Sequence, residues 1–500
     1  MEDEAAYRRA KEAFYTGHSG GTTLEVLAIT AVAPVAVLSV QLIGLALAPK
    51  GSRALSSVLG VLGVTAPLHL AFVAPDYVYY LMAALLSAAG VSLFATGCKF
   101  REHRAAIQDL EEALNAPRKP FVSTYRGGMM MATILAILAV DFQNFERRLA
   151  KTETFGVSLM DAGVGSAMVS PLVRRPAATT GARAAAALLS ASPLIIIGGV
   201  RLVGTRAADY HEHASEYGVH WNFFFTLSVI SIVGSILPLT ASRAAAAALL
   251  MLITAGALEQ VILRATSLQE FILEAPRVDL LSANREGVFG CVGYSALFLS
   301  GTVWNSPAGR LVNGRRSQTG VFGCVGYSAL FLSGTALGGV LFPPEPRSAR
   351  RWGQVALALA AGAGTLWIAV AVLQSQGLVV SRRLVNLPYV LWNLAYNMTI
   401  LLCFLVAEAV PHFVAAPNQG TLASARRSVG GGGDMVCDAV NRNQLFLFLV
   451  ANLSTGAVNL MLPTLRASNA QAFVTVAAYG AALSTIALVL HVRGITLKFW

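Results

Sequence analysis

The sequence predicts an all-α protein, a polytopic transmembrane helical bundle of about 13 spans that forms a single membrane domain over residues 1–500. Two observations support this prediction. Charged residues make up 13% of the chain, whereas soluble domains carry about 25%. Apolar residues come in uninterrupted runs, and a helix of about 20 such residues can cross the hydrocarbon of a bilayer. Because a helix satisfies its own backbone hydrogen bonds in lipid, these runs indicate helices.

The apolar runs give the expected positions of the spans and, from the loops between them, the orientation. The expected spans are 24–48, 54–74, 77–98, 129–142, 157–173, 182–200, 221–241, 243–262, one within 287–342, 354–374, 387–411, 444–463 and 470–491. The loops fall alternately on two faces, and one face carries more Lys and Arg than the other. The positive-inside rule makes that face cytoplasmic, which places the N-terminus in the lumen and the C-terminus in the cytoplasm.

The net charge of +11 indicates membrane lipids as partners and no nucleic acid. The basic residues lie in short loops beside apolar spans, which is typical of the cytoplasmic face of a membrane protein. The five cysteines form no CxxC pattern, so we expect neither a zinc site nor a disulfide framework.

Two segments interrupt the regular series of spans. Residues 287–302 read GVFGCVGYSALFLSGT, and residues 320–335 repeat them letter for letter. The insertion between them, 303–319, is too polar to span, so we expect one copy in the bundle and the other at its edge or in the interface. The segment 413–440 is rich in Gly, Ala and Ser, and we expect it to be a mobile cytoplasmic loop.

The first polar cluster is AVDFQNFERRLAKTETFG, residues 139–156, where an apolar run ends. If the helix ends near Phe142 and the chain turns back, Asp141 and Lys151 can meet. A partly desolvated carboxylate beside an ammonium suits a general base, and the lysine could stabilise an oxyanion. The alternative is an interfacial salt bridge that anchors a hairpin. The cluster also supplies candidate substrate-binding residues, which are Arg147, Arg148 and Glu153.

The second polar cluster, residues 210–227, carries three of the eight histidines. His211 and His213 do not share a helix face, so a metal site is not expected. His220, Trp221 and Asn222 stand at the entrance of a span. They could form an interfacial aromatic belt, or His220 could carry a proton and its two neighbours contact substrate.

A third set of polar residues lies in LLSANREG, residues 280–287, and VSRRLVN, residues 380–386. It gives the candidate substrate-binding residues Asn284, Arg285, Arg382 and Arg383. The arginines could bind phosphate, or they could be ordinary side chains at helix ends that reach toward water.

These clusters, taken in order, resemble those of the GPI inositol acyltransferases, the PIG-W family. The resemblance covers about Phe14 to Trp500 and rests on these motifs: FYTGHSGGTTLEV, AVDFQNFERRLAKTETFGVSLMDAGVG, YHEHASEYGVHWNFFF, LLSANREG, VSRRLVNL, NRNQLFLFLVANLSTGAVNLM and the terminal LKFW. Ser166 follows GVG directly, where the family has further apolar residues, so the fifth span is short.

The resemblance implies an O-acyltransferase of the endoplasmic-reticulum membrane. A palmitoyl chain would pass from palmitoyl-CoA to the inositol 2-hydroxyl of glucosaminyl-phosphatidylinositol, with acyl-CoA as co-substrate and no further cofactor. It implies Asp141 as the base and Lys151 as its partner, followed by His220 and Asn222. The alternative from the residues alone is a transporter or channel for a lipid or small anionic solute, although no internal symmetry of the kind transporters show is evident.

Overall fold

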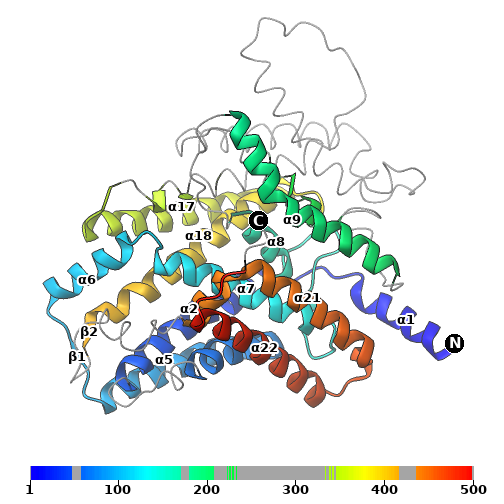
Figure 1. The fold of residues 1–500 in the computed structure, drawn as a ribbon, viewed down its shortest axis with the longest axis horizontal. Coiled ribbons are helices and arrows are strands. Elements are labelled where there is room, and N and C mark those ends of the chain that lie inside the picture. The colour runs from blue at the N-terminus through cyan, green and yellow to red at the C-terminus, as the bar shows by residue number, and fades with distance from the viewer. Residues whose placement is uncertain are drawn as a thin grey trace, which may run out of the picture.

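The computed structural model describes residues 2–47, 58–169, 180–207, 345–415 and 435–497, with single residues between 222 and 232 and between 333 and 342. These residues are mostly helical (Figure 1). The elements are α1 (Glu2–Tyr15), α2 (Thr23–Leu47), η2 (Val61–Thr65), α4 (Ala66–Val73), η3 (Pro75–Tyr77), α5 (Val78–Ala95), β1 (Lys99–Phe100), α6 (His103–Asn115), α7 (Pro120–Ala139), η4 (Arg147–Leu149), α8 (Leu159–Val169), α9 (Thr180–Ala207), α17 (Ala349–Ser375), α18 (Leu387–Ala409), η5 (Val410–Phe413), β2 (Val414–Ala415), α20 (Met435–Arg442), α21 (Gln444–Met461), η6 (Thr464–Arg466) and α22 (Asn469–Val492).

Seven helices within the described residues are long and apolar enough to cross a membrane. They are Thr23–Ala46, Pro75–Ala95, Pro120–Ala139, Ala349–Ser375, Leu387–Phe413, Gln444–Met461 and Asn469–Val492, with two shorter apolar helices at Val58–Val73 and Ala191–Val203. The prediction of an all-α, multi-span protein is therefore confirmed. The spans expected at 221–241, 243–262 and within 287–342, like the repeated segments and the insertion 303–319, lie outside the continuously described residues, so the count of 13 stays a prediction.

Two predicted segments have wrong boundaries. Helix α7 begins at Pro120 and not at 129, because proline fits the first turn of a helix and the polar residues that follow it continue the helix. Arg126, expected in a loop, therefore lies in the helix. The expected loop 413–440 is shorter at both ends, since β2 occupies Val414–Ala415 and the buried helix α20 begins at Met435. Residues 416–434 lie outside the described part.

The loops gather at two opposite ends of the bundle. The Asp141 end consists of loops 16–22, 140–158, 376–386 and 462–468, and hydrogen bonds such as Gly21 N to Val157 O and Gly156 N to Val380 O join them. The basic end consists of loops 98–102, 116–119, 345–348, 410–415 and 493–497. There β1 pairs with β2, and Asn115 Nδ2 donates to Arg347 O at 2.8 Å. The segment after α1 and the residues after α22 thus lie at opposite ends of the bundle. The predicted orientation, with the N-terminus in the lumen and the C-terminus in the cytoplasm, stays a prediction.

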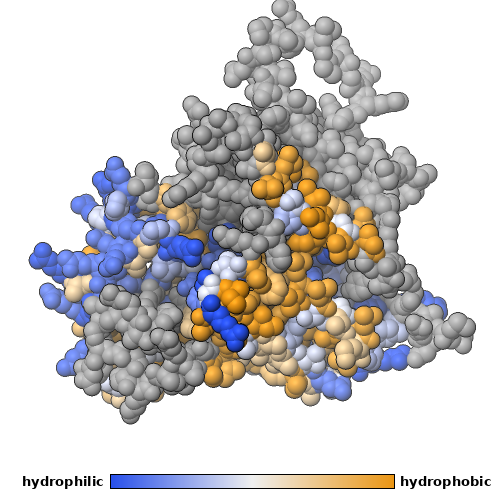
Figure 2. Space-filling view, viewed as in Figure 1, coloured by the Kyte–Doolittle hydropathy of each residue, from blue (hydrophilic) through white to orange (hydrophobic). Residues whose placement is uncertain are grey.

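The surface between these two ends is apolar. In Figure 2, orange residues cover the middle of the molecule, and blue residues gather at the left, over α6 of the basic end. Three exposed tyrosines, Tyr77, Tyr79 and Tyr80, stand at the start of α5 beside the Asp141 end. Such amphipathic rings prefer the level of the lipid headgroups, so this end of the bundle lies at a membrane surface.

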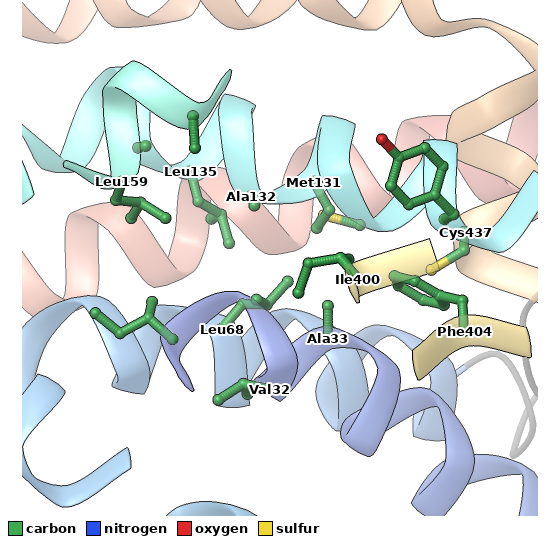
Figure 3. Packing of buried hydrophobic residues seen from close by; sticks show 14 of the residues in the cluster. Val32, Ala33, Leu68, Met131, Ala132, Leu135, Leu159, Ile400, Phe404 and Cys437 are labelled. Atoms are coloured by element: carbon green, nitrogen blue, oxygen red, sulfur yellow. The ribbon is translucent and has the colours of Figure 1, made fainter. Parts of the chain in front are cut away.

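Helices α2, α7 and α18 form the centre of the bundle. Figure 3 shows Ala33 of α2 near Ile400 of α18, and Leu68 of α4 between Val32 of α2 and Leu135 of α7. Helix α20 lies directly on α7, and a Cβ atom added at Gly127 would stand 2.1 Å from the carbonyl oxygen of Cys437. Only glycine allows this approach, so Gly127 is explained by packing.

Candidate active site

Helix α7 ends directly before Asp141, and a tight turn follows. The N–H groups of Asp141 and Phe142 donate to the carbonyls of Leu138 and Ala139, each at 3.1 Å. Arg147 then closes the turn, because its Nη2 donates to the carbonyls of Val140, Phe142 and Phe145 at 2.9–3.0 Å. The helix therefore ends a little before the position expected from sequence, and the chain turns back as predicted.

Asp141 is buried, with an exposed fraction of 4%. The Tyr15 hydroxyl donates to its Oδ1 at 2.5 Å, and the Asn459 amide donates to its Oδ2 at 2.5 Å. Burial raises the pKa of Asp141, while these two hydrogen bonds and the charges of Lys11 and Arg147 lower it, and the net direction is upward. A carboxyl group whose pKa lies closer to neutrality than usual is suited to take and return a proton.

Arg147 and Arg148 have different surroundings. Arg147 stacks on the ring of Phe14, with its guanidinium carbon 3.9 Å from the ring centroid, and burial lowers its pKa to about 10. Arg148 forms ion pairs with Glu25 at 2.9 Å and Asp76 at 2.5 Å. The hydrogen bond with Asp76 raises the pKa of Arg148. Both arginines, predicted as substrate ligands, thus bind the protein's own groups in this structure, and a substrate role for either stays a prediction.

Three loops of the Asp141 end meet through their backbones. Glu153 N donates to His18 O at 2.9 Å, and Ser381 Oγ donates to Thr154 O at 2.5 Å. Gly20 and Gly156 make this possible: both have positive φ, +82° and +122°, and a Cβ atom at either would stand 2.0–2.2 Å from a carbonyl oxygen of the facing loop. Gly20 of GHSGG and Gly156 of KTETFG are therefore required by this close approach.

Lys151 directly precedes this junction of loops, and its side chain is half-buried. The next residue, Thr152, is fixed by hydrogen bonds from its N–H and its hydroxyl to Asp161, at 3.2 Å and 2.8 Å. The hydrogen bonds of Asp141 described above go to Tyr15 and Asn459. The direct partnership of Asp141 with Lys151 stays a prediction, and the structure places both residues at the same end of the bundle.

The centre of the loop junction is a buried ion pair between Arg382 and Asp161. Arg382 Nε lies 2.6 Å from Asp161 Oδ1, and the two side chains are 5% and 1% exposed. Ser158 Oγ also donates to this carboxylate at 2.8 Å. Arg382, predicted to bind phosphate or to reach toward water, faces the carboxylate of Asp161 in the structure, and a phosphate-binding role for it stays a prediction.

The segment that carries Arg382 and Arg383 is shaped by Asn386. The Asn386 side chain accepts from Tyr389 N at 3.1 Å, which caps α18, and from Ser381 N at 3.0 Å. Val385 has a positive φ of 49°, an uncommon conformation for a β-branched residue. Arg383 is half-buried at this strained turn.

Asn222 is buried and caps the start of the next helical segment. Its Oδ1 accepts from Phe224 N at 3.1 Å and Phe225 N at 3.3 Å, and its Nδ2 donates to Gly198 O of α9 at 2.9 Å. These hydrogen bonds give the buried Asn222 side chain a local structural role. The other candidates of the second and third clusters, His220, Trp221, Asn284 and Arg285, lie outside the described residues.

Three residues near Asp141 were not predicted as site residues: Lys11, Tyr15 and Asn459. Lys11 Nζ donates to Asn459 Oδ1 at 2.8 Å. Tyr15 and Asn459 belong to two motifs on which the family resemblance rests, FYTGHSGG and NLSTGAVNLM, and this membership was the available signal.

Comparison with known proteins decides the family. The GWT1 family profile matches residues 7–317 and 315–490. The chain belongs to the GWT1 family. GWT1 is the PIG-W family that the motifs resemble, so that prediction is confirmed. The break between the two matched ranges falls between the two identical segments.

The similar curated proteins span nearly the whole chain. The GPI-anchored wall transfer protein 1 of Gibberella zeae is 34% identical over 538 residues, covering 100% of both chains. The protein of that name from Yarrowia lipolytica is 38% identical over 400 residues, 76% of this chain and 74% of its own. The one from Saccharomyces cerevisiae is 30% identical over 517 residues, 98% of this chain and 99% of its own.

Proposed function

We propose that this protein acts in GPI-anchor biosynthesis as an acyltransferase of the endoplasmic-reticulum membrane. It would move a palmitoyl chain from palmitoyl-CoA to the inositol 2-hydroxyl of glucosaminyl-phosphatidylinositol. Membership of the GWT1 family and relatives named for GPI-anchored proteins support the pathway. The observation that carries the chemistry is Asp141, a buried carboxylate of raised pKa whose two hydrogen-bond donors are neutral side chains.

The proposed reaction is a direct transfer. Asp141 takes the proton of the inositol 2-hydroxyl as its oxygen attacks the thioester carbonyl. The C–O ester bond forms and the C–S bond breaks, and the proton passes from Asp141 to the sulfur of the departing coenzyme A. Lys151, fixed beside Thr152, would stabilise the negative charge that develops on the carbonyl oxygen.

The position of Asp141 fits an acceptor that is itself a lipid. The carboxylate lies just beyond the last turn of α7, at the end of the bundle marked by the tyrosines of α5. A phosphatidylinositol headgroup lies at that depth while its acyl chains remain in the hydrocarbon. The inositol hydroxyls can therefore approach Asp141 without the lipid leaving the membrane.

The test uses the purified full chain in lipid nanodiscs with palmitoyl-CoA and glucosaminyl-phosphatidylinositol. We expect a product heavier by one palmitoyl group in mass spectrometry. The product should resist phosphatidylinositol-specific phospholipase C, because that enzyme uses the inositol 2-hydroxyl as an internal nucleophile. A nanodisc sample without protein is the control.

The same purified chain, placed in vesicles, also tests the transporter alternative. The acyltransferase proposal is wrong if the wild-type chain forms no acylated product but moves labelled glucosaminyl-phosphatidylinositol between the two leaflets of the vesicles. If acylation is found but the product remains sensitive to the phospholipase, the acceptor is a different hydroxyl and the proposed 2-hydroxyl specificity is wrong.

A further inference from the structure

We infer that Tyr15 and Asn459 are positioning residues for Asp141, and that helix α1 is thereby part of the active site. This inference rests on the proposed function, because it concerns the base of the proposed reaction. It adds to that proposal a segment near the start of the chain, with Lys11 acting on Asp141 through Asn459.

The hydrogen bonds of Asn459 fix the direction of its amide. Its Oδ1 accepts from Lys11 Nζ at 2.8 Å and from Thr464 Oγ1 at 3.4 Å. Its Nδ2 donates to Asp141 Oδ2 at 2.5 Å and to Thr455 O at 3.0 Å. A lysine can only donate and a carboxylate can only accept, so the oxygen must face Lys11 and the nitrogen must face Asp141. All four hydrogen-bonding positions of this amide are used, and it cannot rotate without losing them.

Tyr15 holds the other oxygen of the carboxylate from a different element. It is the last residue of α1, and Lys11 stands one turn earlier on the same face of that helix. In Figure 1, α1 lies beside α21, and the Lys11–Asn459 hydrogen bond joins the two helices. Helices α1 and α21 therefore each supply one neutral donor, and together they fix the plane of the carboxylate.

This arrangement leaves Asp141 able to act as a base. Each carboxylate oxygen has two lone-pair sites, and the bonds from Tyr15 and Asn459 use one on each oxygen. The second site on each oxygen can accept the substrate proton, so α1 need not move away for the reaction. The donors stabilise the ionised form and so offset part of the effect of burial on the pKa.

The charged and titratable groups that face Asp141 come from three elements. They are Lys11 and Tyr15 of α1, Arg147 of the turn after α7, and Tyr479 of α22, while Asn459 of α21 is neutral. Removal of the Tyr15 hydroxyl takes away a group that lowers the pKa of Asp141, so that pKa rises. Since the base must be ionised, the acid limb of the activity profile should then move to higher pH.

The same N-terminal segment also reaches the loop that follows Lys151. Directly after Tyr15, His18 O accepts from Glu153 N, and Gly21 N donates to Val157 O, both at 2.9 Å. One continuous stretch, residues 11–21, therefore contacts the partners of Asp141 and the loop of Lys151. This placement explains why a segment before the first span carries one of the motifs of the family.

The test is the pH dependence of kcat and KM for Tyr15→Phe and Asn459→Ala, measured on the full chain in nanodiscs. For Tyr15→Phe we expect kcat to fall by about 10²-fold or less, KM for both substrates to stay within about twofold, and the acid limb to rise by about one pH unit. Lys11→Met should move the limb in the same direction by less. Tyr7→Phe is the matched control on α1, because the Tyr7 hydroxyl accepts from Leu465 N and contacts no part of Asp141 that the structure describes.

The possible outcomes separate this inference from the proposed function. If the wild-type chain acylates its substrate and Tyr15→Phe keeps the wild-type kcat and acid limb, the positioning role is wrong and the proposed function stands. A lower kcat with an unmoved limb and a lower folded yield in size-exclusion chromatography would make Tyr15 a structural residue, and would also overturn the inference. If the wild-type chain itself forms no product, the proposed function fails.

Discussion

Asp141 and Asp161 are both buried carboxylates at the same end of the bundle, and their surroundings differ. Asp161 faces the guanidinium of Arg382 directly and accepts from Thr152 and Ser158 as well. Asp141 accepts from two neutral side chains. The two cations that act on it bind other groups, since Lys11 donates to Asn459 and Arg147 donates to backbone carbonyls. A carboxylate paired with a cation holds loops together, whereas one held by neutral donors can still change its protonation state.

The largest expected effect distinguishes the two by activity. Asp141→Asn keeps the shape of the side chain and removes its basicity, so acylation should fall by about 10²–10⁴-fold while the folded yield holds. The measurement is product formation per folded protein in nanodiscs. Asp76→Asn is the matched control, an exposed carboxylate at the same end. Near-normal turnover of Asp141→Asn would remove Asp141 from the mechanism.

The next effect distinguishes them by stability. Asp161→Leu removes the carboxylate that faces the buried guanidinium of Arg382, and breaking a buried ion pair costs about 3–5 kcal/mol. We expect a large fall in folded yield and in Tm, measured by thermal unfolding in detergent. The double variant Asp161→Leu/Arg382→Leu should recover part of the loss, because both members of the buried pair are then apolar. A single variant as stable as the wild type would contradict the structural role of Asp161.

A smaller effect concerns Lys151, which stands between the two carboxylates in sequence. If it stabilises the oxyanion, Lys151→Met should lower kcat by about 10²–10³-fold with an unchanged folded yield. Lys99→Met is the control, because Lys99 is exposed at the basic end. If Tm also falls in Lys151→Met, the lysine instead stabilises the fold of the loop 140–158.

The smallest effect concerns the backbone that holds the loop 140–158 against residues 18–21. Gly156→Ala forces an alanine to φ +122° and places a Cβ atom 2.0 Å from Ser19 O, so stability should fall by about 1–3 kcal/mol. Gly163→Ala is the matched control in α8, where no atom lies within 4 Å of the added Cβ. Equal Tm values for both variants would show that the junction of loops accommodates the added methyl group without a loss of stability.

The sequence predicted the helical fold and the position of Asp141 because both depend on local patterns. Apolar runs mark spans, and a lone carboxylate at the end of a run is conspicuous. The start of α7 was misplaced since a basic residue, Arg126, argues against a span, although it lies within the helix. Polar residues inside a helix can thus hide its first turns from a hydropathy pattern.

The partners of Asp141 and Arg382 could not be predicted from such patterns. Tyr15 and Asn459 are 126 and 318 residues away from Asp141 in the chain, and only the tertiary fold brings them together. The sequence predicts Arg382 as an anion-binding residue, and the structure adds that one anion it binds is the protein's own Asp161. Sequence spacing indicates which kind of group a charged side chain binds, but it does not indicate which residue supplies that group.

The bond between Asn459 and Asp141 has a consequence for the order in which the chain is made. Asp141 and Tyr15 leave the ribosome before Asn459, which is made 318 residues after Asp141. Until then the carboxylate lacks one of its two donors, and an unsatisfied ionisable group near the hydrocarbon is costly. A chain that stops before α21 therefore lacks this donor permanently, and its Asp141 carboxylate stays incompletely hydrogen-bonded.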